Sequence, residues 1–369
     1  MSGLNPSWHP RVPWRWLIAP IDGPLLSLTA LLMLVALAMV GSASPERMTS
    51  QLLNMMAALT VMRLVAQLPP QRLMHLAPPA YVIGIILLVA VALAGDVSKG
   101  ARRWLDLFVI RIQPSEMMKI AVPLMLAWYY QKREARPRLR DHAIAALILL
   151  VPTALIARQP DLGTAILVLA AGFYVIFLAG LPWKVLIGLA VAGAAAAPLA
   201  WTFLHGYQRA RILTLLDPEK DPLGKGFHII QSTIAIGSGG ILGKGWGHGT
   251  QAQLEFIPER HTDFIFAVLS EEFGLIGNAS LLVLYALLIG RGLMIAANAP
   301  TLFARLLAGA ITLIFFTYAF VNMGMVSGVL PVVGVPLPFI SYGGTALVTL
   351  FLGVGILMSI HKNRMLVQK

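Results

Sequence analysis

Residues 259–274 read ERHTDFIFAVLSEEFG and open one of the long apolar stretches that decide the fold. The polar run ERHTD leads directly into FIFAV, the beginning of a helix that we predict over residues 263–291. This order places the carboxyl group of Asp263 at a membrane boundary, and a charged side chain at the bilayer centre costs about 2.5 kcal/mol or more. Ionisable residues at or inside that boundary usually have a function, so Asp263 is the first residue to explain.

The composition of the chain is that of a membrane protein. Of its 369 residues, 58% are hydrophobic and only 12% are charged, and the mean hydropathy is +0.78. Ten apolar stretches are long enough to cross about 30 Å of hydrocarbon, and they lie at 24–43, 49–67, 78–95, 114–131, 143–158, 162–180, 184–204, 263–291, 302–328 and 338–361. The sequence therefore predicts an all-α integral membrane protein with about ten transmembrane helices and a long extracytoplasmic loop between helices 7 and 8.

Basic residues fix the predicted orientation, since short loops rich in Lys and Arg stay in the cytoplasm. The connection between the fourth and fifth predicted spans is one such loop and holds Lys132, Arg133, Arg136, Arg138 and Arg140. With both termini inside, the chain divides into a cytoplasmic N-terminal segment (1–23), a polytopic domain (24–361) with a large periplasmic loop (205–262), and a cytoplasmic tail (362–369). The first span is longer than the apolar core of a signal peptide, so we expect it to be retained.

A net charge of +12 raises the question of a nucleic-acid partner. The basic residues are scattered over both predicted faces and form no recognition module with interleaved aromatic residues, so we expect no nucleic acid. Most of the basic residues are explained by their role in fixing the membrane orientation and by their attraction to anionic lipids of the inner leaflet. The outer runs RRW at 102–104 and YQRAR at 207–211 oppose the orientation rule, and they suit either an anionic lipid phosphate or simple headgroup contact.

The outer loop, residues 205–262, is a long stretch without an apolar segment that could span the membrane. Its stretch DPEKDP at 217–222 is a poor calcium loop, because proline stands where the required glycine would be. Residues 224–249 are rich in glycine, but the Gly-Lys pair at 243–244 lacks the Ser or Thr that follows it in a P-loop. We predict instead that 224–249 and 328–344 are flexible or re-entrant segments that form the walls of one cleft.

Two charged pairs lie within or beside the predicted spans. Glu116 and Lys119 are three residues apart and share a helix face. They either neutralise each other as a structural ion pair or bind the substrate. Arg158 and Asp161 flank a proline in a short outer connection, where a turn and a helix cap explain both.

Two further carboxylates follow Asp263 on the same predicted helix. Glu271 comes eight positions later, about 80° around the helix, so we expect both to face one polar channel, whereas Glu272 points towards another helix. No HExxH or clustered Cys and His indicates zinc, and no GxSxG indicates a serine hydrolase. An outward cavity with one carboxylate and several cations suits glycosyl transfer from a lipid pyrophosphate, and it suits lipid transport equally.

Four motifs resemble the SEDS family of cell-wall proteins. They are ARQPDLGTAILVL (157–169), YQRARILTLLDPEKDPLGKGFHIIQSTIAIGSGG (207–240), WGHGTQAQLEFIPERHTDFIFAVLSEEFG (246–274) and MVSGVLPVVGVPLPFISYGG (325–344). The resemblance covers nearly the whole chain and is closest to the elongation branch, because Arg260 follows Glu259 and PVVGVP follows Leu330. Thr345 departs from the Ser that many members carry after the double glycine.

The resemblance implies a peptidoglycan glycosyltransferase that polymerises lipid II on the outer face of the bacterial inner membrane. Asp263 matches the essential Asp of the family, which would activate the 4-hydroxyl of the acceptor N-acetylglucosamine, with inversion and release of undecaprenyl pyrophosphate. Glu116 and Lys119 match a charged pair that lines the family's cavity. Candidates for phosphate contact are Arg103, Arg209, Arg211 and Lys244, and the other polar residues that we expect at the substrate are Asp161, Gln231, Ser232, Glu259, Arg260, His261, Thr262 and Glu271.

The resemblance also implies partners. Such proteins act with a class B penicillin-binding protein, the transpeptidase, so we expect its single-span helix against the outer helices, besides other elongation proteins and membrane lipids. No cofactor is certain, and a divalent cation, Mg²⁺ or Mn²⁺, at the pyrophosphate is left open. The alternatives are a lipid II flippase, the division-specific sibling and a non-catalytic scaffold. The concentration of polar residues on the outer side argues against the flippase.

Overall fold

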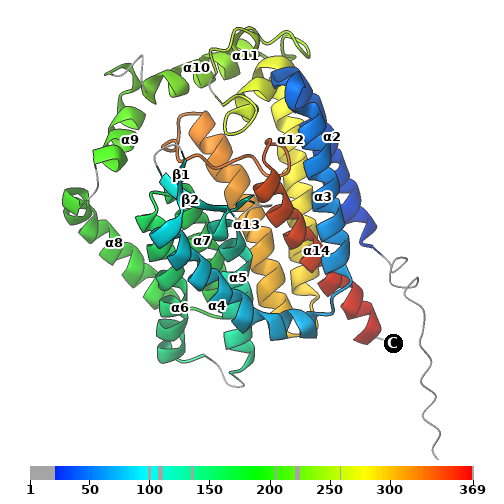
Figure 1. Ribbon diagram of the computed structural model, residues 1–369, viewed down its shortest axis with the longest axis vertical. Helices are drawn as coiled ribbons and strands as arrows, with labels where there is room; N and C mark the ends of the chain where they lie inside the picture. Colours follow the sequence, from blue (N-terminus) through cyan, green and yellow to red (C-terminus); the bar gives the residue numbers. More distant parts are fainter. Residues whose placement is uncertain are drawn as a thin grey trace, which may run out of the picture.

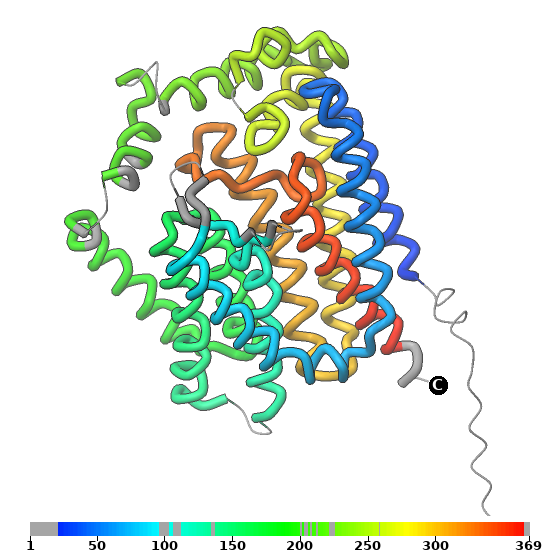
Figure 2. The backbone as a smooth tube through the Cα atoms, viewed as in Figure 1, coloured from blue at the N-terminus to red at the C-terminus, as the bar shows by residue number. Residues whose placement is uncertain are grey.

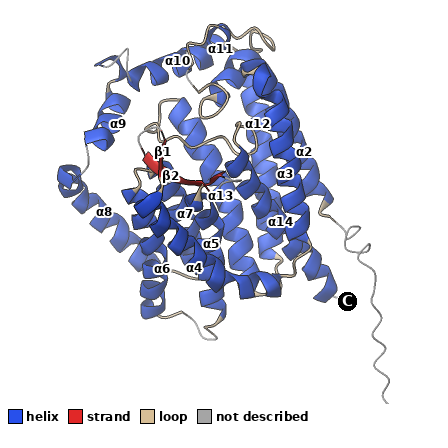
Figure 3. Cartoon of the chain, in the orientation of Figure 1, coloured by secondary structure: helices blue, strands red, loops and turns tan. Residues whose placement is uncertain are grey.

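The computed structural model describes residues 21–98, 101–106, 111–133, 137–203, 206–220, 225–257 and 259–367, and in these ranges the chain is mostly helical (Figure 3). Most of the predicted N-terminal segment thus lies outside the described residues. The α-helices are α2 (Gly23–Ala43), α3 (Met48–Ala66), α4 (Pro70–Ala94), α5 (Pro114–Gln131), α6 (Leu139–Arg158), α7 (Leu162–Leu178), α8 (Trp183–Phe203), α9 (Gly206–Leu216), α10 (Lys225–Ser238), α11 (Thr250–Gln253), α12 (Ile265–Ala297), α13 (Leu302–Val326) and α14 (Gly344–Val367). Two short 3-10 helices, η1 (Pro45–Arg47) and η2 (Pro218–Lys220), complete the helical part.

Each of the ten predicted apolar stretches overlaps one long helix. Six helices are long and apolar enough to cross a membrane, namely α2, α4, α6, α12, α13 and α14, so the chain is a multi-pass membrane protein. The largest boundary error is at α4, which begins at Pro70 rather than 78. Smaller errors occur at α12, which ends at Ala297 rather than 291, and at α14, which covers Gly344–Val367 rather than 338–361. Proline is favourable in the first turn of a helix, where its missing N–H needs no partner, and this explains the early start of α4.

Helix α13 lies at the centre of the bundle, between α12 on one side and α5 and α7 on the other (Figure 1). It is the most buried of the six apolar helices. Helix α8 lies at the margin, where the green tube in Figure 2 runs along the outside of the bundle, and residues 188–199 are exposed throughout. The uncharged polar side chains of α13, which are Thr312, Thr317, Tyr318 and Asn322, therefore face protein, whereas Lys184 and Thr202 of α8 are exposed.

The outer loop predicted at 205–262 contains three helices, α9, α10 and α11. The prediction of a flexible or re-entrant segment at 224–249 is wrong for its first half, because α10 covers residues 225–238. The helix has one buried face, on which Ile229, Ser232 and Ala235 lie at intervals of three residues. Among the described residues of this stretch, the irregular ones are 239–249.

These irregular residues pack into a break in α12. At Gly274 the backbone has φ of +61° and ψ of −152°, and an added Cβ would lie 2.5 Å from the nitrogen of Gly243. Beyond the break, two amides of α12 donate to the carbonyls of Gly240 and Ile241, at 2.9 and 3.2 Å. Before the break, two carbonyls accept from Lys244 and Gly245, both at 3.0 Å. The loop thus satisfies the backbone groups that the broken helix leaves free, as non-helical backbone in a membrane protein requires.

A small antiparallel sheet joins α4 to α5 and was not predicted from the sequence. It contains β1 (Asp96–Ser98), β2 (Ala101–Asp106) and β3 (Arg111–Ile112), in the order β1-β2-β3. Trp104 pairs with Asp96, and Leu105 pairs with Ile112. The sheet holds Arg103 and Trp104 over the N-terminal end of α5, which is the end where the site lies.

Candidate active site

One cavity of about 310 Å³ lies where five chain segments meet, next to the N-terminal ends of α5, α7 and α14. Its lining residues come from β2, α5, α7, the segment before α12, and the connection between α13 and α14 together with the beginning of α14. They are Arg103, Trp104, Gln113, Glu116, Lys119, Asp161, Thr164, Leu167, Glu259, Thr262, Asp263, Gly334, Val335, Pro336, Tyr342, Gly343, Thr345 and Ala346. The structure therefore brings together seven of the residues predicted for the site, from positions as distant as 103 and 263.

Asp263 lies two residues before α12, in a turn that begins at Glu259. Its Oδ2 approaches the opposite wall so closely that a Cβ added to Gly334 would lie 3.4 Å away. Gly334 has φ of +73°, which a residue with a side chain rarely adopts. The predicted second segment, 328–344, therefore does form a wall of the cavity, whereas the described residues of the first, 225–249, contribute no lining residue.

Glu116 and Lys119 form the predicted pair on one face of α5, with 2.5 Å between the Glu116 Oε1 and the Lys119 Nζ. Both residues are buried, at 8% and 2% exposure. The ammonium also donates to the hydroxyl of Tyr318 on α13 and lies 4.8 Å from the centre of its ring. Glu116 Oε2 is buried without a hydrogen-bond partner among the described residues, so one acceptor of this pair is available to a ligand in the cavity.

Tyr318 was missed by the sequence analysis. Its hydroxyl lies in an apolar helix, and a buried tyrosine hydroxyl usually has a hydrogen-bond partner. That rule predicts some polar contact for the residue, but the partner is 199 positions away in the sequence. The spacing of residues within one helix cannot predict the contact between Tyr318 and Lys119, which lie on different helices.

Asp161 caps a helix and also lines the cavity. It caps α7 by accepting a hydrogen bond from the backbone N–H of Thr164 at 3.3 Å, so the predicted helix cap is confirmed. Its carboxylate also accepts from Gln113 Nε2 at 3.1 Å and lies 3.9 Å from Arg103 Nε. Arg103 donates further to the carbonyl of Pro160 at 2.7 Å, and these contacts fix a cation at the mouth of the cavity.

The other polar residues of the 259–263 turn point in different directions. Thr262 donates to the carboxylate of Glu259 at 3.0 Å, and both line the cavity. His261 packs against the ring of Tyr342, with 5.7 Å between the ring centroids. Burial lowers the pKa of His261, and the nearby Arg47 lowers it further, so its imidazole is neutral at neutral pH.

Arg260 points away from the cavity. One of its nitrogens, Nη1, donates to the carbonyl of Ala252 at 2.6 Å, and Nη2 lies 3.0 Å from the carboxylate of Glu255. The described contacts of this side chain therefore join the turn to α11.

Lys244, which is partly buried, and Glu271, which is fully buried, form an ion pair outside the cavity, with 2.7 Å between Lys244 Nζ and Glu271 Oε1. Glu271 has no exposed surface and also accepts from the hydroxyl of Thr250 at 3.0 Å and from the amide of Gln251 at 3.0 Å. The expectation that Glu271 shares a polar channel with Asp263 is therefore wrong, because its carboxylate faces the loop that ends in α11. Glu272 does reach another helix, as predicted, since it accepts from Ser42 at the end of α2.

The remaining predicted residues, on α9 and α10, do not line this cavity either. Arg209 donates to the carbonyl of Thr202 at 2.7 Å, and Ser232 donates to the carbonyl of Val326 at 2.9 Å. Arg211 lines a separate pocket of about 190 Å³ together with His228. Gln231 lies on α10 beside Ser232 and is half-buried.

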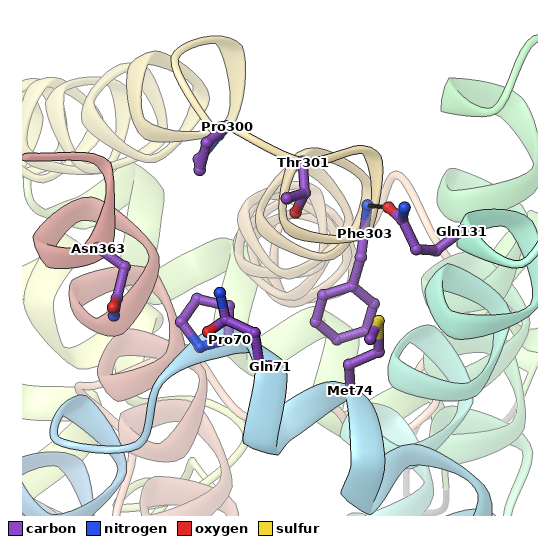
Figure 4. Close-up of a pocket in the computed structure, with 8 residues that line it drawn as sticks. All are labelled: Pro70, Gln71, Met74, Gln131, Pro300, Thr301, Phe303 and Asn363. Atoms are coloured by element: carbon purple, nitrogen blue, oxygen red, sulfur yellow. Dashed lines mark hydrogen bonds between the residues drawn. The ribbon is translucent and has the colours of Figure 1, made fainter. Parts of the chain in front are cut away.

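A second cavity, of about 400 Å³, lies at the opposite end of the bundle (Figure 4). It is lined by Pro70, Gln71, Met74, Gln131, Pro300, Thr301, Phe303 and Asn363. None of these side chains is ionisable, and none also lines the Asp263 cavity. The dashed line in Figure 4 marks the backbone N–H of Phe303 donating to Gln131 Oε1 at 2.8 Å, which caps the beginning of α13.

We expect Lys244 and Glu271 to act in folding rather than in substrate contact. Replacing Glu271 by Ala would leave the partly buried Lys244 without its counter-ion, a change that costs roughly 3–5 kcal/mol for a buried pair. The thermal midpoint in detergent should fall clearly, while Glu255→Ala, on an exposed carboxylate, should change it little. If Lys244→Met instead raises KM for a lipid pyrophosphate substrate without lowering the thermal midpoint, Lys244 is a phosphate ligand.

Comparisons with known proteins agree with the sequence motifs. Residues 16–366 match the family of FtsW, RodA and SpoVE, described as cell cycle proteins. The peptidoglycan glycosyltransferase MrdB of Escherichia coli K12 is 56% identical over 366 residues, which is 98% of this chain and 99% of MrdB. A probable peptidoglycan glycosyltransferase FtsW of Geobacter metallireducens is 38% identical over 75% of this chain and 74% of its own length.

Solved structures give the same result. A chain from work described as "Structural coordination of polymerization and crosslinking by a peptidoglycan synthase complex" is 37% identical, with a TM-score of 0.81, and the match covers 93% of this chain and 98% of that one. The rod shape determining protein RodA of Thermus thermophilus is 31% identical, with a TM-score of 0.71 over 93% of this chain and 97% of RodA. The chain therefore belongs to the FtsW, RodA and SpoVE family, known as the SEDS family.

Proposed function

We propose that this protein is a peptidoglycan glycosyltransferase that polymerises lipid II into glycan strands during cell elongation. The observation that carries the proposal is the shared cavity, in which a carboxylate next to an apolar helix, Asp263, lies with the buried pair Glu116–Lys119 and with Arg103. The identity to MrdB favours the elongation branch over the division sibling, because it is 56% over nearly the whole chain, against 38% for an FtsW.

In the proposed reaction Asp263 acts as general base. Its carboxylate takes the proton from the 4-hydroxyl of the acceptor N-acetylglucosamine while that oxygen attacks the anomeric carbon of the donor N-acetylmuramic acid. The bond between this carbon and the pyrophosphate oxygen breaks, the carbon is inverted, and undecaprenyl pyrophosphate leaves. Lys119 and Arg103 are the cations of the cavity that stabilise the negative charge on the leaving group.

A divalent cation at the pyrophosphate would need substrate oxygens as ligands. No three His, Asp or Glu side chains among the described residues lie close enough together to hold a metal ion by themselves. Mg²⁺ commonly binds through one or two carboxylates together with substrate phosphates, and Asp161 and Glu259 offer carboxylates in this cavity.

The protein is proposed to work in the bacterial inner membrane, with both termini in the cytoplasm and the Asp263 cavity facing the periplasm. Its proposed partners are a class B penicillin-binding protein of the elongation complex, other elongation proteins and membrane lipids. The support for the transpeptidase partner is the likeness to a chain from a synthase complex in which polymerisation and crosslinking are coordinated.

The decisive test is polymerisation of lipid II by the purified protein, with and without a class B penicillin-binding protein. Glycan strands formed by the pair and lost with Asp263→Asn would support the proposal. Transfer of lipid II across vesicles, with no polymer under either condition, would support the flippase alternative instead.

A labelling experiment also separates the two functions, since the chain contains no cysteine. Single cysteines replace Thr345 in the Asp263 cavity and Gln71 in the cavity of Figure 4. We expect farnesyl pyrophosphate, a short lipid pyrophosphate, to slow labelling at position 345 by a membrane-impermeant thiol reagent added from the periplasmic side. For position 71, the same reagent is added from the cytoplasmic side. A flippase alternates its cavity between the two faces, so equal protection at position 71 would contradict the transferase.

A further inference from the structure

Three consecutive backbone carbonyls hold the segment that carries Asp263. The carbonyl of His261 accepts from the amide of Tyr342 at 2.9 Å, and that of Thr262 accepts from Ser341 Oγ at 2.7 Å. The carbonyl of Asp263 itself accepts from Asn322 Nδ2 at 2.8 Å. All three donors belong to α13 or to the connection between α13 and α14, and we call them the carbonyl clamp.

The two side chains of the clamp are themselves fixed. Asn322 has no exposed surface, and its amide nitrogen donates a second hydrogen bond to the carbonyl of Val335 at 2.7 Å. Ser341 is buried, and its hydroxyl accepts from the amide of Leu337 at 2.7 Å. Asn322 therefore joins the Asp263 turn to the 334–336 stretch, which is the facing wall of the cavity.

This arrangement controls the direction of the Asp263 side chain. Hydrogen bonds from α13 and its connection to three successive carbonyls restrain the peptide planes on both sides of the Asp263 Cα, and the Asp263 side chain lies at the cavity lining. Catalysis depends strongly on such placement, because a displacement of about 1 Å can cost roughly 100-fold in rate. Neither Asn322 nor Ser341 lines the cavity, so neither contacts substrate directly.

We propose that Asn322 and Ser341 are positioning residues for the general base, a role that rests on the proposed function of Asp263. Asn322 sets the separation between Asp263 and Gly334, and Ser341 orients the peptide that precedes Asp263. The clamp has no part in proton transfer and acts only through the geometry of the turn.

Kinetics of three variants test the role. Asn322→Leu keeps the volume but removes both donors, and Ser341→Ala removes the hydroxyl. We expect kcat for lipid II polymerisation to fall about 10- to 100-fold in each, with KM changed less than about threefold. Thr312→Val is the matched control, because this buried α13 hydroxyl donates only to the carbonyl of Ala308, one turn away in its own helix, at 2.8 Å. A control that loses as much kcat as Asn322→Leu would contradict the proposal.

A double-mutant cycle separates positioning from general damage. In the Asp263→Asn background, whose residual rate no longer depends on the base, Asn322→Leu should cause no further loss. An equal fold-loss in both backgrounds would overturn the positioning role, because the residue would then act independently of Asp263.

Hydrogen exchange tests the clamp without reference to the reaction. The amides of Thr262 and Phe264 donate to the carbonyl of Glu259, at 3.0 and 3.3 Å, and their exchange should be faster in Asn322→Leu than in the parent or in Thr312→Val. Unchanged exchange would refute the clamp. If Asp263→Asn polymerises at the parent rate, the proposed base is wrong, and the exchange result still decides whether the clamp holds the turn.

Discussion

Asp263→Asn is expected to lower the rate of lipid II polymerisation by at least ~100-fold, the usual contribution of general base catalysis. The substitution keeps the size of the side chain and removes the proton acceptor. Folding should be retained, because the contact with Asn322 is made by the backbone carbonyl of Asp263, which the substitution leaves intact. The measurement is glycan formation by the purified variant together with its transpeptidase partner.

Asp217→Asn is a suitable control for this experiment. Asp217 pairs with Lys220 on the surface and lies outside the cavity, so loss of its charge should leave the rate unchanged. A variant Asp263→Asn that inserts normally, binds its partner and still forms strands at the parent rate would remove Asp263 from the mechanism.

The second large effect is expected at the pair on α5. Glu116→Ala or Lys119→Ala leaves one buried charge unpaired, which should cost roughly 3–5 kcal/mol of stability. The double variant Glu116→Gln with Lys119→Met has no such charge, so its thermal midpoint should return towards that of the parent. Its polymerisation activity should stay low, because the cation proposed to stabilise the pyrophosphate is absent.

The comparison of single and double variants separates a structural pair from a functional one. Return of both the thermal midpoint and the activity in the double variant would mean that the pair serves only the fold. Tyr318→Phe provides a further control, since it removes the hydroxyl that bonds Lys119 but keeps the charged pair.

The sequence predicted those features that depend on local patterns. Apolar length located all ten long helices, and a spacing of three residues predicted the contact between Glu116 and Lys119. The preference of Asp for the helix N-cap predicted the role of Asp161 at α7. Each of these depends on neighbours within a few positions in the chain, where spacing directly implies proximity.

Features that depend on distant contacts could not be predicted in this way. Lys244 was expected to contact a phosphate, yet its partner is Glu271, which is 27 positions away in the sequence. The two residues meet because the loop that carries Lys244 packs into the break in α12 at Gly274. Asn322 is one polar residue in an apolar helix, and its two acceptors, the carbonyls of Asp263 and Val335, lie in separate connections. Residues 224–249 contain nine glycines, which obscure the helical pattern of α10, although only Gly226 and Gly237 lie within that helix.

Tyr318 and Asn322 are four residues apart on α13 and therefore lie on one face, about 6 Å apart along the helix axis. The first contacts Lys119 and the second holds the turn of Asp263. A single helical turn in the central helix of the bundle thus joins Lys119 to the turn that carries Asp263, and both residues line the cavity. Insertion of one residue between 318 and 322 would rotate one of these side chains by about 100° relative to the other, so the length of this turn is itself a constraint on the evolution of the enzyme.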